Sequence, residues 1–240
     1  MKFNTPLIEG KLIKRYKRFL ADVKLKNGEV VTAHCANPGS MQTVNIVDSK
    51  VWLSPSKNPN RKLKYTWEII EIAKNKIGIN TSLPNTIVKE AINEKQIPEL
   101  KGYTSLKSEV KYGKNSRIDI LLRSDLKPDC YVEVKNVTMR RRSKDNNIAE
   151  FPDSVTARGK KHLLELTEMV SLGFRSVMFF LIQREDCDYF SIAEDIDPDY
   201  AVTLDKAMEA GVELLCYKCK LTPKFIEITS PVQYIKELKP

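Results

Sequence analysis

The chain has 240 residues, of which 42% are hydrophobic and 30% charged, and its formal net charge at pH 7 is +9. This length can bury a sizeable core, as one large domain or two small ones. No apolar run approaches membrane-spanning length and no secretory signal is visible, so we expect neither membrane insertion nor secretion. The five cysteines are an odd number without a framework spacing, which favours reduced thiols in the cytoplasm.

The excess of positive charge lies in the first third of the chain. Residues 1–82 contain 15 Lys and Arg against 6 Asp and Glu, whereas the rest of the chain contains 25 of each. A basic segment joined to a neutral one suggests that the first segment binds a polyanion. A generally lysine-rich composition without a specific partner is the alternative, and the uneven distribution argues against it.

The basic first third reads as short strands separated by turns. Lys26-Asn-Gly28 predicts a tight hairpin turn, because Asn-Gly favours positive φ. The expected strands are 12–25 (as one strand or two), 30–35, 51–53, 65–73 and 77–81. About five strands in such a length favour a small Greek-key barrel of the OB-fold type, which we assign to residues 1–82.

Basic and aromatic residues alternate on the first strand of this barrel, at Arg15, Tyr16, Lys17 and Arg18. Such side chains can pair with phosphates and stack on bases, so these four residues are candidates for nucleic-acid binding. A strand with a buried aromatic face and a solvated basic face has the same pattern. The sequence does not separate the two interpretations.

The rest of the chain, residues 83–240, alternates helices with strands. We expect helices over 85–94, with Asn85 as the cap residue, from 153 or 154 to about 172, and over 198–210. The expected strands are 106–111, 117–123, 131–137, 176–183 and 212–217. The order α-β-β-β-α-β-α-β predicts an α/β (α+β) domain with a largely buried sheet.

Two neighbouring strands of this domain carry charges among apolar residues. Side chains alternate along a strand, so Glu133 and Lys135 share one face of the second strand. On the preceding strand, Asp119 points to the face opposite to the one that carries Ile118 and Ile120. If the apolar faces pack together, Asp119, Glu133 and Lys135 meet. Two adjacent carboxylates repel, and Mg²⁺ (or Mn²⁺) bound by Asp119 and Glu133 relieves that repulsion. With Lys135 to position water, the three residues predict metal-assisted phosphodiester hydrolysis.

Other charged residues could assist, each with an ordinary alternative. Glu109, on the strand before, could add a carboxylate oxygen or could pair with nearby lysines. Glu90, on the first helix, is a further candidate, although such a residue is more often at the surface.

A second set of candidates could hold the nucleic-acid backbone. Arg140, Arg141 and Arg142 follow the Glu-x-Lys strand and could clamp DNA at the mouth of the site, or form a solvated loop. Arg158, Lys161 and His162 lie three and four residues apart near the start of the next helix, where they could contact the scissile phosphate. A histidine at such a position is more often surface or packing.

Asp119 with Glu133-Val-Lys135 resembles the core of PD-(D/E)xK nucleases, with Ile118 where that pattern has Pro. Longer blocks resemble the sugar fermentation stimulation protein (SfsA) family, from about Pro6 to Lys218. These blocks are Leu12–Val23, His34–Met41, Thr66–Glu68, Tyr103–Gly113 and Arg158–Leu163. The resemblance implies DNA binding, by a small N-terminal barrel joined to a nuclease-like αβββαβ domain. In this fold an extra carboxylate often lies on the first helix, where Glu90 is, and the helix bearing Lys161 and His162 borders the site.

Two functions of different classes follow. The first is a metal-dependent DNA nuclease that uses Asp119, Glu133 and Lys135. The second is a non-catalytic DNA-binding regulatory protein acting on sugar fermentation genes, which the family name favours. The paired carboxylates favour the nuclease, because they weaken DNA binding unless a cation neutralises them. The sequence leaves open whether the DNA is single- or double-stranded and whether the protein is a homodimer.

Overall fold

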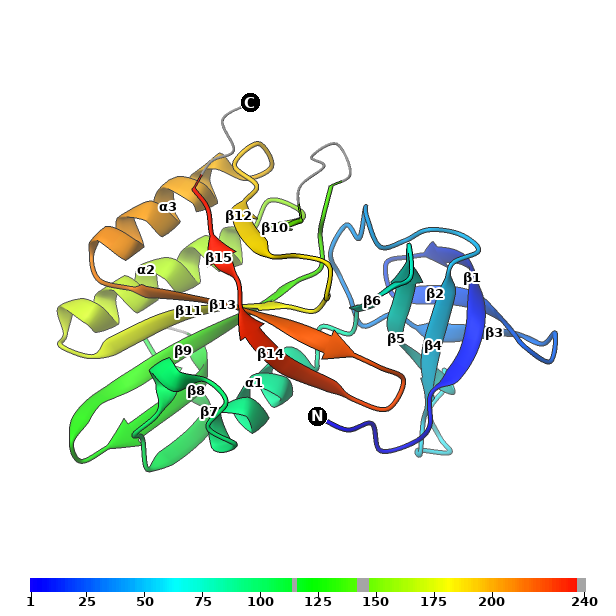
Figure 1. Cartoon of the computed structure of the whole chain (residues 1–240), viewed down its shortest axis with the longest axis horizontal. Helices are drawn as coiled ribbons and strands as arrows, with labels where there is room; N and C mark the ends of the chain where they lie inside the picture. The colour runs from blue at the N-terminus through cyan, green and yellow to red at the C-terminus, as the bar shows by residue number, and fades with distance from the viewer. Residues whose placement is uncertain (114–115, 142–146, 237–240) are drawn as a thin grey trace.

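The computed structural model describes residues 1–113, 116–141 and 147–236. Figure 1 shows two lobes side by side, with the barrel on one side and the α/β domain on the other. The barrel strands are β1 (Ile8–Tyr16), β2 (Leu20–Leu25), β3 (Val30–His34), β4 (Lys50–Pro55), β5 (Tyr65–Ile72) and β6 (Asn75–Gly78). The second lobe contains α1 (Pro84–Asn93), the 3-10 turn η1 (Pro98–Leu100), β7 (Ser105–Tyr112), β8 (Ser116–Ser124), β9 (Lys127–Val137), β10 (Ile148–Phe151), α2 (Ala157–Ser171), β11 (Arg175–Ile182), β12 (Tyr189–Ile192), α3 (Pro198–Glu209), β13 (Glu213–Leu221), β14 (Ile226–Pro231) and β15 (Gln233–Tyr234).

The first lobe is a closed barrel. Its strand order is β3-β2-β1-β4-β5-β6, and an additional pairing between β3 and β5 closes the ring. The interior is filled by alternating inward side chains, among them Leu12, Val23 and Trp67, which are fully buried. The predicted OB-fold-like barrel is confirmed, and residues 12–25 form two strands because Lys17 and Arg18 turn the chain with positive φ.

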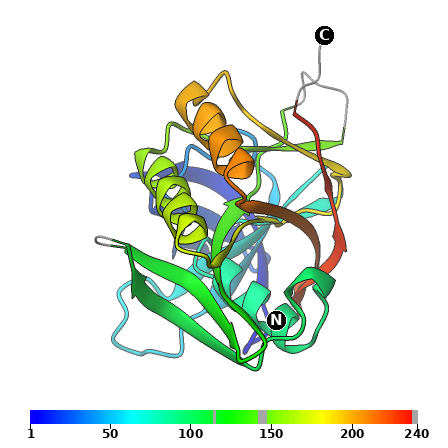
Figure 2. The ribbon, with the colours of Figure 1, turned by 90° about the vertical axis from the view of Figure 1, so that its left-hand side faces the viewer.

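The second lobe is built on a mixed sheet of six strands in the order β14-β13-β11-β9-β8-β7. Strand β11 is parallel to both β9 and β13, whereas β7, β8 and β14 pair antiparallel with their neighbours. Figure 2 shows α2 and α3 side by side over one face of the sheet, and α1 packs on the other face. The α-β-β-β-α-β-α-β order is confirmed.

The sequence did not predict a second, smaller sheet. Strands β10, β12 and β15 form it beside the main sheet, and β14 adds an edge strand to the main sheet. These strands have two to six residues. Segments this short have no usable hydrophobic period, so pattern alone does not reveal them.

The sequence predicts neither a membrane-spanning segment nor disulfide bonds. Across the described ranges, no helix is both long and apolar enough to cross a membrane. All five cysteines are buried and free.

Side chains of both lobes fix the loop that follows β3, residues 37–41. On the barrel side, the Arg15 guanidinium donates to the carbonyls of Asn37 (2.9 Å) and Gly39 (3.0 Å). From the second lobe, the Asp153 carboxylate accepts from the Met41 N–H (3.2 Å), and the Asp153 carbonyl accepts from Ser40 Oγ (2.8 Å). This loop is therefore hydrogen-bonded to both lobes and forms part of the contact between them.

Removing the Asp153 side chain tests this junction. In Asp153→Ala the part-buried Met41 N–H loses its acceptor, and we expect unfolding to require about 1–3 kcal/mol less free energy. Urea unfolding followed by circular dichroism would measure the loss. Asp199→Ala is the control, because its ion pair with Lys160 is exposed to solvent and therefore contributes little to stability. Equal losses in the two variants would argue against a junction role for Asp153.

Candidate active site

The main sheet opens where Asp119 and Glu133 would face each other. The pairing of β8 with β9 runs through Ile120 opposite Val132, and past this pair the Val134 N–H donates to Asp119 Oδ2 (2.8 Å). The other carboxylate oxygen of Asp119 accepts from Asn85 Nδ2 (2.8 Å) on α1. The Asp119 side chain thus takes the place of the main-chain acceptor that the Val134 N–H would have in a regular sheet. Its carboxylate is held between β8 and β9, where their main-chain pairing stops.

Asn85 differs from its expected role. The sequence suggested Asn85 as the residue that caps the first helix. The helix instead begins at Pro84, and its cap residue, Leu83, makes no side-chain hydrogen bond. Asn85 is free to hold Asp119 because Pro at the start of the helix has no N–H to satisfy. Sequence reasoning missed this positioning role.

Glu133 lies in the middle of the sheet and is almost fully buried, with 2% of its surface exposed. Its Oε1 accepts from Lys135 Nζ (2.7 Å) and also contacts His162 Nδ1 on α2. Lys135 Nζ is in turn 3.0 Å from the same ring nitrogen. The strand and the helix therefore bring a carboxylate, an ammonium and an imidazole together, as the alternation in β9 predicted for the first two.

The two carboxylates have opposite pKa shifts. Burial, and then the negative charge of Glu133, raise the pKa of Asp119 above its usual value, although Val134 and Asn85 donate to it. Burial alone would raise the pKa of Glu133 too, but the His162 hydrogen bond and the charge of Lys135 hold it below its usual value. Mutual repulsion of two acidic groups is thus present, as expected of residues that share a cation.

Two further buried groups belong to the same cluster and were missed from the sequence. Glu165 on α2 has 6% of its surface exposed, and neither carboxylate oxygen has a hydrogen-bond partner among the described residues. Burial, followed by the charges of Glu133, Glu165 and Asp119, raises the pKa of Tyr112, whose hydroxyl also has no described partner. Glu165 follows His162 by three residues, and that spacing on one helix face could have revealed it.

The other two acidic candidates do not complete a group of three metal-ligating side chains with Asp119 and Glu133 among the described residues, although Glu109 lies opposite Asp119 in the pairing of β7 with β8. Glu109 is exposed on β7 and has a φ of 56°, which turns it out of the regular strand between its paired neighbours Ser108 and Val110. Glu90 forms an ion pair with the amino group of Met1. The structure brings neither carboxylate to the group formed by Asp119 and Glu133.

The basic candidates of the second lobe divide into two sets. Arg140 pairs with Asp186 (2.7 Å), and Arg141 pairs with both Glu150 and Asp195 (2.5 Å each), so both guanidinium groups are engaged within the protein. Arg142 lies outside the described residues. On α2, Arg158 Nε is 3.4 Å from His162 Nε2, and Lys161 is 3.6 Å from Glu165 Oε1. These helix residues border the buried cluster.

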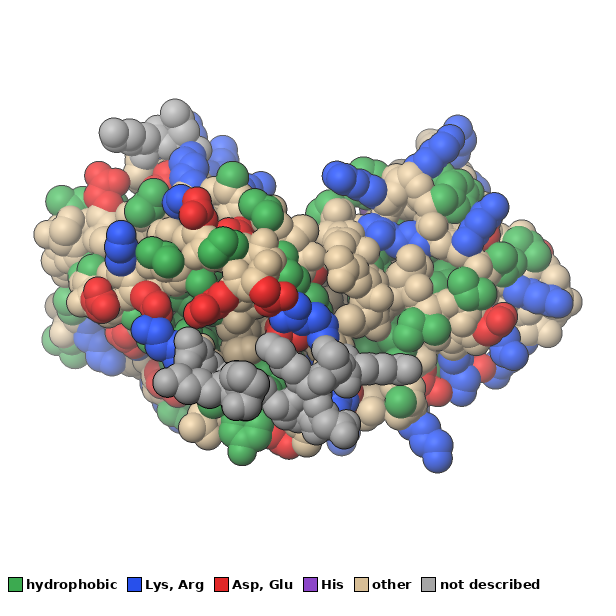
Figure 3. Space-filling model, turned by 90° about the horizontal axis from the view of Figure 1, so that it is seen from above, with side chains coloured by type: hydrophobic (Ala, Val, Ile, Leu, Met, Phe, Trp, Pro, Cys, Tyr) green, Lys and Arg blue, Asp and Glu red, His purple; other side chains and the backbone are tan. Residues whose placement is uncertain are grey.

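The candidate nucleic-acid-binding residues of the barrel also fall into two sets, one bonded within the protein and one exposed. Arg15 binds the loop carbonyls of residues 37–41, and the Tyr16 hydroxyl donates to Asp22 (3.1 Å). Lys17 and Arg18 are exposed at the end of the β1–β2 hairpin. Figure 3 shows Lys and Arg side chains projecting from several parts of the barrel lobe.

The cluster has the donors that a hard divalent cation needs. No group of three or more His, Cys, Asp or Glu side chains is arranged as a complete metal site in the described part of the chain. Mg²⁺, however, commonly binds through one or two carboxylates and keeps several waters. Glu133 Oε2 is buried without a hydrogen-bond partner among the described residues, and the Asp119 carboxylate interacts with it electrostatically. These residues fit such a cation.

Comparisons with known proteins place the whole chain in one group. Residues 13–79 match the model described as "SfsA N-terminal OB domain", and residues 82–225 match "Sugar fermentation stimulation protein RE domain". A "Sugar fermentation stimulation protein homolog" of Maricaulis maris is 54% identical over 233 residues, covering 97% of this chain and 98% of the relative. A homolog of the same description from Rhodospirillum rubrum is 55% identical over 230 residues, covering 93% and 94%.

A solved structure has the same architecture across its full length. It is described as "The structure of Pyrococcus Furiosus SfsA in complex with Ca2+" and superposes with a TM-score of 0.87. It is 25% identical in sequence, and the match covers 98% of each chain. By its family models and its relatives, the chain belongs to the sugar fermentation stimulation protein family.

Proposed function

We propose that the protein binds DNA and hydrolyses its phosphodiester bonds with a divalent metal, Mg²⁺ or Mn²⁺, at Asp119 and Glu133. The observation that carries the proposal is the buried Glu133 carboxylate, which has one oxygen bonded to Lys135 and His162 and the other without a described partner. A protein that only binds DNA gains nothing from such a group, because an uncompensated buried carboxylate is costly. The Ca²⁺ in the relative's structure supports a divalent cation here.

The neighbouring residues supply the other functions that hydrolysis needs. The bound metal would act as a Lewis acid and provide a water that attacks the phosphate. Lys135 Nζ, held by Glu133 and His162, would orient that water or stabilise the charge that develops on the phosphate. Asn85 and the Val134 N–H keep Asp119 oriented, and Arg158 and Lys161 would hold the backbone on either side.

The barrel would bind the DNA at a distance from the bond that is cut. Lys17 and Arg18 are exposed at the end of a hairpin, and Phe19 beside them has 47% of its surface exposed. Exposed basic and aromatic side chains of this kind pair with phosphates and stack on bases. The buried, free cysteines suit the reducing cytoplasm.

The direct test is cleavage of labelled single- and double-stranded DNA with Mg²⁺, with Mn²⁺ and with EDTA. We expect products with either metal and none with EDTA. DNA binding that is indifferent to metal, with no products under any condition, would leave a DNA-binding regulatory protein in place of the nuclease.

Metal affinity should fall as the solution becomes acidic. The pKa of Asp119 is raised, so a proton competes with the cation at pH values above the usual range of aspartate, about 3.9. We therefore expect Mg²⁺ or Ca²⁺ affinity to fall progressively from neutral pH down toward the usual aspartate range, with proton release on binding. Isothermal titration calorimetry in buffers of different ionisation enthalpy measures both. Equal affinity across this interval, without proton release, would place the cation away from Asp119.

A further inference from the structure

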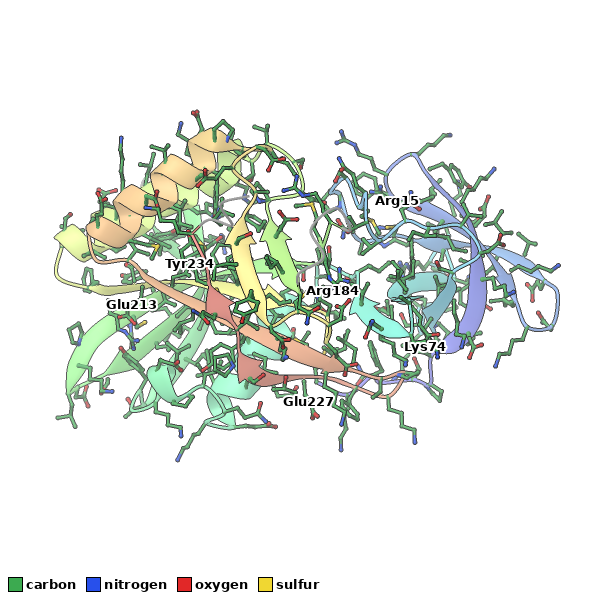
Figure 4. All side chains as sticks on the ribbon, turned by 45° about the horizontal axis from the view of Figure 1, so that its top comes forward. Arg15, Lys74, Arg184, Glu213, Glu227 and Tyr234 are labelled. Atoms are coloured by element: carbon green, nitrogen blue, oxygen red, sulfur yellow. The ribbon has the colours of Figure 1, made fainter. Side chains whose placement is uncertain are left out.

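A pocket of about 280 Å³ lies between the two lobes, and both apolar and polar side chains line it, including the carboxylates of Glu150 and Asp153. Asn37 and Pro38 line it from the barrel, Asn136 and Thr138 from the end of β9, and Phe151 and Pro152 from the segment before α2. Figure 4 labels Arg15 on the barrel and Arg184 between the lobes, and both side chains support this region. None of the residues discussed so far for hydrolysis lines the pocket.

The walls of the pocket are fixed by hydrogen bonds beneath them. Arg15 donates to the Asn37 carbonyl (2.9 Å), and the buried Arg184 donates to the Thr138 carbonyl (2.8 Å). Arg184 is itself paired with Asp186 (2.6 Å). The pocket is therefore largely pre-formed, as small-molecule sites usually are.

The lining offers hydrogen-bond donors between apolar surfaces. Asn37 Oδ1 accepts from the Gly39 N–H (2.9 Å), and Asn136 Oδ1 accepts from Gln183 Nε2 (2.6 Å). Each amide is thereby oriented with its NH₂ group as the remaining donor. Together with the Thr138 hydroxyl, these donors suit the carbonyl oxygens and ring nitrogens of a nucleobase, and Phe151 with the two prolines suits its flat faces.

The pocket adjoins the proposed catalytic residues along two elements. Asn136 follows Lys135 directly on β9, and Thr156, which lines the pocket, caps the helix that carries Arg158 and His162. The volume lies just below the range of about 300–1,000 Å³ typical of pockets for drug-sized ligands. A volume this small suits one base better than a base pair.

We propose that this pocket receives one unpaired nucleobase next to the bond that is cut. The inference rests on the proposed function and specifies its substrate: DNA that has an unpaired nucleotide, as a single strand or as an overhang on a duplex. Continuous duplex is a poor substrate, because a paired base would first have to leave the stack.

The test compares a variant that fills the pocket with a neighbouring variant that does not. Ser154 is exposed and lines the pocket, so Ser154→Trp should fill it without disturbing the core. Val155, with 74% of its surface exposed and outside the lining, is the matched site for Val155→Trp. Thermal unfolding of both variants verifies that they fold as the wild type does.

Binding is measured in EDTA by fluorescence anisotropy, so that no strand is cut. The probes are a blunt duplex, the same duplex with a three-nucleotide overhang, and that overhang made of abasic nucleotides. Wild type and Val155→Trp should bind the normal overhang about tenfold more tightly than the other two probes, the effect of about one stacked base. Ser154→Trp should bind all three alike.

The outcomes separate the inference from the proposed function. Equal affinity of wild type for the normal and abasic overhangs would overturn the base pocket while DNA binding stands. A tenfold preference retained in Ser154→Trp would also overturn it. If wild type binds none of the probes, either in EDTA or with Ca²⁺ present, the proposed function fails and the inference fails with it.

Discussion

Glu133→Gln is expected to slow DNA cleavage by about 10³-fold, and Lys135→Ala by about 10²–10³-fold. The glutamine keeps the shape of Glu133 but loses the charge that would bind the cation and that holds Lys135 and His162. The alanine removes the ammonium next to the phosphate. Rates are measured under single-turnover conditions at saturating Mg²⁺, so that weaker DNA binding does not mask the chemical step.

A matched glutamate elsewhere in the same sheet serves as the control. Glu227 lies on the edge strand β14 and is labelled in Figure 4 well away from α2. Glu227→Gln makes the same chemical change and should leave the rate within about twofold of the wild type, as a surface substitution usually does. If Glu133→Gln cleaves as fast as Glu227→Gln, the assigned site is not where hydrolysis occurs.

Glu165→Met is expected to make the protein more stable and less active. The buried Glu165 carboxyl group has no described hydrogen-bond partner, and its ion pair with the half-exposed Lys161 is long (3.6 Å). Replacing such a buried ionic group with a well-packed apolar side chain often stabilises by about 1–4 kcal/mol. Its position beside Tyr112 and Glu133 indicates a role in the site, so we expect cleavage to fall by about tenfold. Urea unfolding and single-turnover cleavage give the two quantities.

Glu168 on the same helix provides the comparison for this prediction. It is exposed, so Glu168→Met should change the free energy of unfolding by less than about 0.5 kcal/mol and leave cleavage unaltered. A Glu165→Met protein that is less stable than the wild type, with normal cleavage, would show that Glu165 serves the fold alone.

The part of the site that lies on β9 could be predicted because a strand has a strict period of two. That period alone puts Glu133 and Lys135 on one face, where α2 covers them. The same rule failed on the neighbouring strand. Ile118 and Ile120 were expected to share a face, but Ile118 packs in the core beneath α2 and Ile120 in the core beneath α1. The gap beside Asp119 interrupts the alternation, and no residue pattern marks that gap.

The other features of the site could not be predicted because they depend on contacts between residues that are far apart in the sequence. Arg140 and Arg141 were predicted to clamp DNA or to form a solvated loop. Their ion pairs with Asp186 and Asp195 could not be foreseen, because these partners come more than forty residues later. Glu165 read as an ordinary polar residue of a helix, because its burial depends on how α2 packs over the sheet. No local pattern shows that the loop at residues 37–41 contacts Asp153 of the other lobe.

The hydrogen bond between Asp119 and the Val134 N–H has an evolutionary consequence. This carboxylate closes the sheet where main-chain pairing fails, so it has a structural task that is independent of any metal. A descendant that lost hydrolysis would still be selected to keep an acceptor at this position, whereas Lys135 would be free to change. Among related proteins, retention of the lysine is therefore the better marker of an active enzyme, and retention of the aspartate reports mainly an intact fold.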